Sequence, residues 1–391
     1  MIKNEAKKTI NIGVVGLGNI AQQHISNILE RKVAGACVSA VCSRDQNALS
    51  LHYKQTHNIN HYTHYQDLVN AKEVDAVIIA TPTMSHFEIA KYALEQNVHV
   101  MLEKPIGLSS YEGEVLLSCQ SSKTVFALML NQRTDPVFAK MKDIVDSGLL
   151  GNIQRTHWTM TNWFRPEIYY QVSDWRATWK GEGGGLLVNQ AIHNLDVFQW
   201  ICGLPNKIKA FCEFGKYHNI EVEDEVTAFL RYPNGATGLF IGSTGEAPGI
   251  NRFDIIGDKA SLMFNSGRLS LCTNSVSTAE FSQQTDDMFG MPDTDKENIE
   301  IEEAVNQHAV IMSNFVAAID KNEELIAPAA DGLASLDIAN AMLLSTWQNT
   351  EVSLPLDRSE YQQNLDLKIA SSSLRTKSLR KANVDMSASY R

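Results

Sequence analysis

Lys104 and His193 have side chains that can donate or accept a proton. Lys104 follows an apolar strand pattern and His193 follows a glycine-rich segment, and both kinds of feature are common at ligand sites. Lys104 belongs to Glu103-Lys104-Pro105, directly after the apolar residues 99–102. Open α/β sheets bind ligands beyond the carboxyl ends of their strands, so a lysine here can reach a ligand crevice. Its ammonium can stabilise a developing alkoxide or relay a proton, and Pro105 stiffens the backbone beside it. An ordinary surface lysine is the alternative interpretation.

His193 lies in the segment 183–200, which begins with three consecutive glycines and continues with a helical pattern. Its imidazole has the side-chain pKa best suited to removing a hydroxyl proton near neutral pH. If the segment is helical, Asn189 and His193 share a face because they are four residues apart, and Asp196 follows on the same side. Asp196 could orient the imidazole ring or simply interact with the helix surface. A structural histidine is the alternative for His193.

A glycine motif near the amino terminus predicts a dinucleotide site. The run Gly16-Leu17-Gly18-Asn19-Ile20-Ala21 follows an apolar strand pattern and begins a helical one. Gly16 allows a tight turn, Gly18 lets backbone amides approach a pyrophosphate, and Ala21 permits close packing of helix on strand. The amino end of the helix then presents free N–H groups to the phosphates. The alternative is a tight strand–helix turn without a ligand.

The choice of cofactor depends on the end of the second strand pattern. An acidic residue there would bind the adenosine ribose 2′-OH, whereas this chain has Ser43 and Arg44, which suit a 2′-phosphate. Asp45 is close enough that a small loop shift would bring it to the ribose. We therefore expect NADP(H), with NAD(H) as the alternative. The other residues expected to contact the cofactor are Thr81, Pro82, His86, Glu103 and Lys104.

The elements that must position these residues fall into two groups. Residues 10–16, 38–42, 76–80, 99–102 and 125–130 are apolar strand patterns separated by amphipathic helical ones, which predicts a parallel sheet. Beyond residue 150, alternating runs and hairpin turns such as Pro233-Asn234-Gly235 predict a mostly antiparallel sheet, and residues 304–321 and 329–346 are helix-like. We expect a Rossmann domain over 1–130, a second α+β domain over 131–370 and a polar, basic tail over 371–391.

An aromatic and arginine-rich stretch of the second domain, residues 162–179, suggests carbohydrate recognition. Aromatic faces bind the C–H patches of sugars, and guanidinium groups donate to their hydroxyls. The alternative is that aromatic side chains of this domain, Trp158 and Trp179 among them, belong to its core. The expected substrate-binding residues are Lys104, Arg133, Trp163, Arg165, Tyr170, Trp175, Arg176, Asn189 and His193.

Composition excludes several other classes of protein. The chain has 391 residues, a formal net charge of −11 and a sequence pI of about 5.5, so a nucleic-acid partner is not expected. It has no apolar run long enough to cross a bilayer, no signal-peptide pattern and six scattered cysteines, which favours a cytoplasmic protein. His52, His57, His61 and His64 are spaced like metal ligands but lie in a polar stretch expected to be an outer helix and loop. We expect no metal.

Taken together, these motifs resemble the Gfo/Idh/MocA oxidoreductase family. The resemblance runs from about residue 10 to 370 and rests on the glycine motif, Ala80-Thr81-Pro82, Glu103-Lys104-Pro105 and the segment 183–196. It implies a Rossmann domain followed by an α/β domain with a large, open, mostly antiparallel sheet, which commonly packs against another subunit of a homodimer or homotetramer. It also assigns the catalytic lysine to Lys104 and the catalytic histidine to His193.

One position departs from the family pattern. Many members have Asp where this chain has Asn189, which cannot be an acid or base but can hydrogen-bond a sugar hydroxyl. The Asn-x-x-x-His form is similar to a branch with UDP-N-acetylglucosaminuronate 3-dehydrogenases and some sugar or glycoside dehydrogenases. The expected function is NAD(P)-dependent oxidation of a ring hydroxyl of a sugar, glycoside or cyclitol. The alternatives are glycoside cleavage through transient oxidation at C3, and a non-catalytic dinucleotide-binding regulator.

Overall fold

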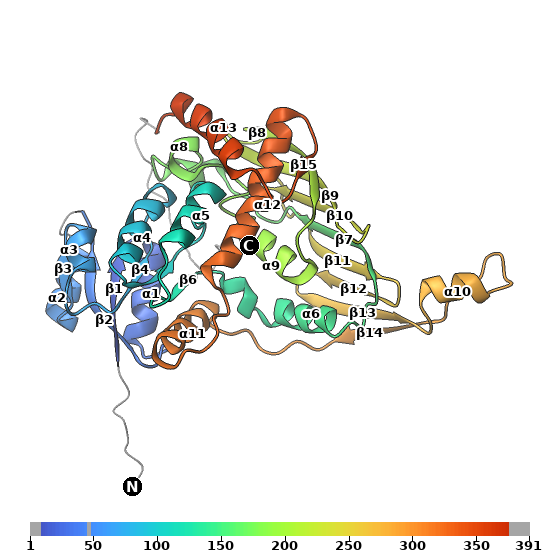
Figure 1. The fold of residues 1–391 in the computed structure, drawn as a ribbon, viewed down its shortest axis with the longest axis horizontal. Coiled ribbons are helices and arrows are strands. Elements are labelled where there is room, and N and C mark those ends of the chain that lie inside the picture. The colour runs from blue at the N-terminus through green and yellow to red at the C-terminus, as the bar shows by residue number, and fades with distance from the viewer. Residues whose placement is uncertain (1–8, 45–47, 375–391) are drawn as a thin grey trace, which may run out of the picture. The chain divides into compact units, whose positions relative to one another are not determined.

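A computed structural model describes residues 9–44 and 48–374 of the chain (Figure 1). The chain forms two compact units, each considered below by itself. The first runs to Thr134 and also includes Val305–Leu333, and the second consists of Asp135–Ala304 and the residues from Ala334 onward. The chain thus returns to its first unit after most of the second, whereas the sequence patterns predict 131–370 as one domain. No helix in the described part of the chain is long and apolar enough to span a membrane.

The first unit contains a six-stranded sheet in the order β3-β2-β1-β4-β5-β6, with every neighbouring pair parallel. This order, which reverses direction at β1, is that of a doubly wound dinucleotide-binding sheet. Its strands are β1 (Ile10–Val15), β2 (Ala36–Cys42), β3 (Asn60–Tyr62), β4 (Ala76–Ile79), β5 (His99–Leu102) and β6 (Phe126–Leu128). Its helices are α1 (Asn19–Leu29), α2 (Ala48–His57), α3 (Tyr65–Val69), η1 (Thr83–Ser85), α4 (His86–Glu95), α5 (Ser110–Cys119), η2 (Asn131–Thr134) and α11 (Gln307–Lys321).

The central strands are apolar because both of their faces are covered. All four residues of β4 are buried, and Ile12, Val14 and Met101 in β1 and β5 are 0% exposed. The Rossmann prediction is therefore confirmed. The prediction of helix and loop over residues 52–64 is wrong in part, because β3 pairs with β2 there. Three polar residues at the edge of a sheet show too little periodicity to indicate a strand.

The second unit contains a nine-stranded sheet in the order β14-β13-β12-β11-β7-β10-β9-β8-β15. Only the β7–β10 pair is parallel, which confirms the mostly antiparallel prediction. The strands are β7 (Ile153–Met160), β8 (Lys207–Phe214), β9 (Glu223–Arg231), β10 (Thr237–Ser243), β11 (Asn251–Gly257), β12 (Ala260–Asn265), β13 (Arg268–Asn274), β14 (Thr294–Ile299) and β15 (Val352–Ser353). The helices are α6 (Pro136–Asp146), α7 (Glu167–Gln171), α8 (Trp179–Glu182), α9 (Ile192–Cys202), α10 (Thr278–Gln284), α12 (Ala329–Gln348, which begins in the first unit) and α13 (Arg358–Ser371).

One face of this sheet packs against helices. Trp158 of β7 stacks on Phe253 of β11 with ring centroids 4.4 Å apart, and Phe138 of α6 and Phe198 of α9 contact the same indole. Trp158 is therefore a core residue. Trp179 is also buried, against Phe214 and Trp347. These two aromatic side chains do not belong to a substrate site.

The opposite face of the sheet carries exposed apolar side chains. Phe211 on β8 is 60% exposed, and Leu239 on β10 and Ile256 on β11 are also exposed. Because side chains alternate along a strand, their exposure follows from the burial of their sequence neighbours on the helix-covered face. The segment that contains α10, between β13 and β14, projects away from the sheet (Figure 1).

Candidate active site

The phosphate-binding turn has the geometry that the glycine motif predicts. Gly16 has φ +99°, and a Cβ at this residue would lie 2.5 Å from the carbonyl oxygen of Ala80, so only glycine fits. Gly18 caps α1, and a Cβ there would have nothing within 4 Å. The first turn of α1 carries no acidic residue, so its positive end is unopposed. A cofactor pyrophosphate therefore fits this turn, with Asn19 and Ile20 beginning the helix that would face it.

The end of β2 holds the residues expected to read the adenosine ribose. Ser43 lies directly after β2, and its Oγ is 2.9 Å from Nε2 of His61 on the adjacent strand β3. Arg44 is exposed. Asp45 lies outside the described residues. His61, considered only as a possible metal ligand from sequence, thus belongs to the polar group beside Ser43.

His86 joins the two loops that follow β4 and β5. Its Nδ1 is 2.8 Å from the carbonyl oxygen of Pro105, and its Nε2 is 2.9 Å from that of Thr81. Burial lowers the pKa of His86, while the two carbonyl contacts act in the opposite direction. The imidazole thereby holds the Thr81-Pro82 turn against the segment that carries Lys104. Lys104 itself is the partly exposed residue in the otherwise buried stretch 100–107.

Glu103, beside Lys104, belongs to a buried group of acid and imidazoles. His24 of α1 is fully buried, and its Nε2 lies 2.7 Å from Oε1 of Glu103. The ring of His308 on α11 lies with its centroid 5.6 Å from that of His24. Burial opposes ionisation of Glu103, but His24, His308 and Lys104 outweigh it and lower its pKa to about 2. Burial lowers the pKa of His308 to about 4.

Neither His24 nor His308 was among the candidates from sequence. His24 lies 79 residues from Glu103 in the chain, and no local pattern connects the two. His308 reaches the first unit only because the chain returns to it at α11. A polar residue at helical spacing from apolar ones, as His24 is from Ala21 and Ile28, is the signal that sequence offers.

In the second unit, the three glycines form a turn rather than the start of a helix. Gly183 ends α8 with φ +74°, and a Cβ on Gly185 would lie 2.1 Å from the carbonyl oxygen of Glu223. Glu223 Oε1 accepts hydrogen bonds from the backbone N–H groups of Gly185 and Leu187, both at 2.9 Å. The turn is thus built against β9.

The helix predicted over 189–196 begins later than expected. Residues 186–191 are turns, and α9 starts at Ile192, so His193 and Asp196 are helical and Asn189 is not. The close packing of the glycine turn on β9 explains the delay. His193 and Asp196 are buried, and the Asp196 carboxylate accepts a hydrogen bond from Gln199 at 3.2 Å. Asn189 is partly exposed.

Asn189 belongs to a polar cluster around Glu182. Its Nδ2 donates to Oε1 of Glu182 at 2.5 Å, and Nη1 of Arg176 lies 3.8 Å from the same oxygen. Arg176 Nη1 also donates to the Tyr169 hydroxyl at 2.7 Å, and the guanidinium stacks on the rings of Tyr169 and Trp175. Burial opposes the charge of Arg176, but Tyr169 and Glu182 raise its pKa. Tyr169 belongs to the aromatic and arginine-rich stretch expected from sequence, whereas Glu182 was not among the candidates.

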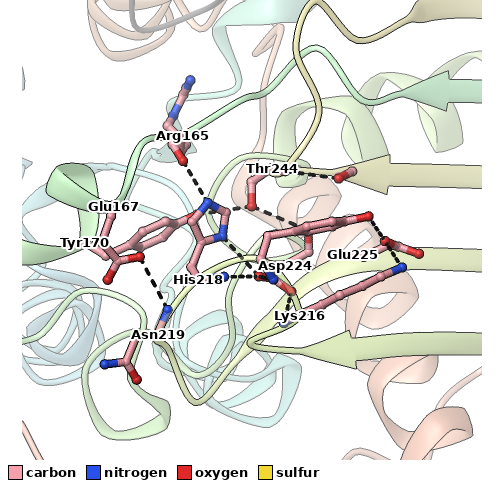
Figure 2. A network of polar contacts seen from close by, with 12 residues as sticks. Arg165, Glu167, Tyr170, Lys216, His218, Asn219, Asp224, Glu225 and Thr244 are labelled. Carbon is pink, nitrogen blue, oxygen red and sulfur yellow. Dashed lines mark hydrogen bonds and ion pairs between the residues drawn. The ribbon is translucent and has the colours of Figure 1, made fainter.

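A second network holds the loop that contains Arg165 (Figure 2). His218 lies with Nε2 2.8 Å from the carbonyl oxygen of Arg165 and Nδ1 3.0 Å from Oδ2 of Asp224. Burial acts against protonation of His218, but Asp224 and this carbonyl raise its pKa. The Arg165 guanidinium lies over the Trp163 ring, 5.1 Å from its centroid.

Tyr170 stands in the same network. It is buried, its ring centroid lies 4.7 Å from that of His218, and its hydroxyl donates to Thr244 at 3.1 Å. The network therefore fixes the aromatic and arginine-rich stretch to β9 and the end of β10. His218 and Asp224 were not predicted from sequence.

Arg133 has a different environment from the other arginines. It is buried in the first unit, where its guanidinium donates to the carbonyl oxygen of Ile326 at 3.1 Å and to Asp331 at 2.5 Å. These bonds hold the segment 326–331 to η2. We therefore leave Arg133 out of the proposed substrate site. Among the described residues, no group of three or more His, Cys, Asp or Glu side chains is arranged to hold a metal ion.

Comparison with known proteins places both units in one family. A family model described as an oxidoreductase family with an NAD-binding Rossmann fold matches residues 10–131, and a GFO/IDH/MocA C-terminal domain model matches residues 138–263. The uncharacterized oxidoreductase YrbE of Bacillus subtilis is 27% identical over 349 residues, which cover 85% of this chain and 93% of that protein. Inositol 2-dehydrogenase of Salmonella typhimurium is 27% identical over 205 residues, covering 49% of this chain and 54% of the relative.

Solved structures show the same fold. The WlbA dehydrogenase of Chromobacterium violaceum, solved with NADH and UDP-GlcNAcA, superposes with a TM-score of 0.75 at 24% identity, covering 90% of this chain and 98% of that one. The matches to both domain models agree with the six-stranded parallel sheet and the nine-stranded sheet described above. This protein is a member of the Gfo/Idh/MocA family of NAD-binding oxidoreductases.

Proposed function

We propose that this protein oxidises a ring hydroxyl of a sugar, glycoside or cyclitol, or reduces the matching ketone, with NADP(H) as the preferred cofactor and NAD(H) as the alternative. The observation that carries the substrate class is the cluster of Asn189, Arg176 and Tyr169 around Glu182. It sets hydrogen-bonding groups beside aromatic faces, the combination that carbohydrate rings require. Arg176 Nε has no hydrogen-bond partner among the described residues, so a substrate oxygen could use it. The inositol 2-dehydrogenase relative supports the same class.

We assign the proton chemistry to Lys104 and His193. The ammonium of Lys104 polarises the hydroxyl oxygen of the substrate, and the imidazole of His193 accepts its proton as the carbon is oxidised. Asn189 hydrogen-bonds a substrate hydroxyl. When bound, the nicotinamide cofactor supplies the hydride acceptor. Gly16, Gly18 and the amino end of α1 hold its pyrophosphate, and Ser43 and Arg44 face its adenosine ribose.

The first experiment is a substrate screen. Purified protein is given myo-inositol, D-glucose and simple glucosides with NADP⁺ and with NAD⁺, and reduced nicotinamide is followed by absorbance. We expect turnover with at least one of these compounds. Release of aglycone without a net change in reduced nicotinamide would contradict the dehydrogenase proposal and favour glycoside cleavage.

The second experiment tests the assigned residues. Lys104→Met and His193→Ala should each lower kcat by about 10²-fold or more, the usual contribution of a proton-transferring side chain, and still bind cofactor. Lys54→Met and His57→Ala, at exposed positions of α2, are the matched controls. Near-full turnover by either Lys104→Met or His193→Ala would show that the assignment is wrong.

A further inference from the structure

We infer that Glu182 is a positioning residue that sets which end of the Asn189 amide meets the substrate. The role toward substrate rests on the proposed function. The pairing of Glu182 with Asn189 rests only on the structure of the second unit. Glu182 is the last residue of the short helix α8 and is 3% exposed. Its side chain thus turns inward, toward the glycine turn that carries Asn189.

Both carboxylate oxygens of Glu182 face N–H donors. Oε2 accepts the backbone N–H of Ala177 at 2.5 Å, and Oε1 accepts Nδ2 of Asn189 at 2.5 Å. An amide placed the other way round would set Oδ1 of Asn189 against Oε1 of Glu182, and two acceptors repel each other. Glu182 therefore holds the amide with Nδ2 inward and Oδ1 on the opposite side. In this orientation Asn189 accepts a hydrogen bond from a substrate hydroxyl.

The same geometry explains why residue 189 is an amide in this chain. An aspartate at this position would bring two carboxyl groups within a hydrogen-bond distance of each other, and such a pair cannot ionise both members near neutral pH. The carboxylate of this pair belongs to Glu182, which is more deeply buried than Asn189. Arg176, 3.8 Å from Oε1, is the cation that faces this charge.

The test is a pair of substitutions, Asn189→Asp and Glu182→Gln, made singly and together in the full chain. In Asn189→Asp the two carboxyl groups should share a proton with an apparent pKa above about 6. The unfolding free energy should then fall, relative to the wild type, as pH rises from about 4, where unfolded carboxyl groups titrate, to about 6 or above. In the double variant the introduced glutamine amide can donate to the introduced aspartate, so this pH dependence should disappear. This readout needs no substrate.

The kinetic arm uses myo-inositol, or the best substrate of the screen above. Glu182→Gln leaves one acceptor oxygen for two N–H donors, so the amide orientation is lost and kcat/KM should fall about tenfold, mainly through KM. In the double variant the introduced glutamine amide donates to one oxygen of the introduced aspartate, and the other aspartate oxygen remains an acceptor for the substrate, so most of that loss should be recovered. Glu221→Gln is the matched control, because Glu221 accepts the N–H of Trp179 at 2.7 Å at the other end of α8.

The outcomes separate the two proposals. If Asn189→Asp follows the pH profile of the wild type, or if the double variant is as impaired as Glu182→Gln alone, the positioning role of Glu182 is overturned. Wild-type protein that turns over none of the screened compounds contradicts the proposed function, while the pH profiles still decide whether Glu182 and Asn189 are paired.

Discussion

Glu223 offers a sharp test of the forces that hold the glycine turn. It begins β9, is 0% exposed, and accepts the N–H groups of Gly185 and Leu187 through Oε1 alone. Its Oε2 is buried and has no hydrogen-bond partner among the described residues. Burial therefore raises the pKa of Glu223 to about 7, even though the two backbone bonds favour the ionised form.

The sign and size of the effect on stability follow from this pKa. The folded protein holds the proton up to about pH 7, whereas the unfolded chain releases it near the ordinary value of 4.5. Stability therefore falls as pH rises from about 4.5 to about 7 and remains low above it. At about 1.4 kcal/mol per pKa unit, the loss is about 3 kcal/mol. Glutamine has the shape of the protonated acid and keeps the Oε1 acceptor, so Glu223→Gln should escape this loss.

We expect Glu223→Gln to match the wild type near pH 4.5 and to be about 3 kcal/mol more stable near pH 8. All six tryptophans lie in the second unit, so urea unfolding followed by tryptophan fluorescence reports on the unit that contains Glu223. Glu223→Ala removes the acceptor and should be destabilised at both pH values. A difference between Glu223→Gln and wild type that does not change with pH would refute the reasoning.

The remaining predictions concern other parts of the molecule. Glu103→Gln should have the opposite pH dependence to Glu223→Gln. The lowered pKa of Glu103 stabilises the fold above about pH 4.5, and this stabilisation is lost as pH falls toward 2. Unfolding followed by circular dichroism should therefore show that Glu103→Gln is less stable than the wild type at pH 7, with a smaller difference at pH 3. Retained stability at pH 7 would contradict the role of His24. Arg44→Ala should raise KM for NADP⁺ about tenfold and leave KM for NAD⁺ nearly unchanged in steady-state assays; equal changes would remove Arg44 from the 2′-phosphate site. Phe211→Asp or Leu239→Asp on the exposed sheet face should shift the protein toward monomer in light scattering if copies associate there, and an unchanged mass would exclude this face.

Much of the first unit could be predicted because its signals are local. Residues 10–15 and 76–79 are mostly or entirely apolar, as strands buried on both faces require. The glycine motif is also local, since the turn at Gly16 and the open side of Gly18 depend on a few neighbouring residues. β14 could not be predicted from sequence. Almost all of its side chains are exposed and most are charged or polar, so apolar and polar residues do not alternate along the strand.

The candidate site divides in the same way. Sequence patterns indicated Lys104, Asn189 and His193 by residue type and context. They did not indicate Glu182, because nothing in its sequence context distinguishes it from any other helical glutamate. Only the fold brings its carboxylate within hydrogen-bond distance of the Asn189 amide. The predicted start of α9 was also wrong. The turn before the helix is set by the packing of Gly185 on β9, a contact between residues 38 positions apart that no local pattern indicates.

The sequence by itself determined the two-sheet architecture, the dinucleotide turn and the residue types available for proton transfer, since these depend on periodicity and on the conformations of single residues. Only the tertiary structure decided how buried charges are balanced. Glu103 and Glu223 are both buried glutamates, yet His24 and His308 outweigh burial and lower the pKa of the first, whereas burial prevails and raises the pKa of the second. The physical reason is that the energy of a buried charge depends on what lies within a few ångströms, and distant segments of the chain supply those neighbours.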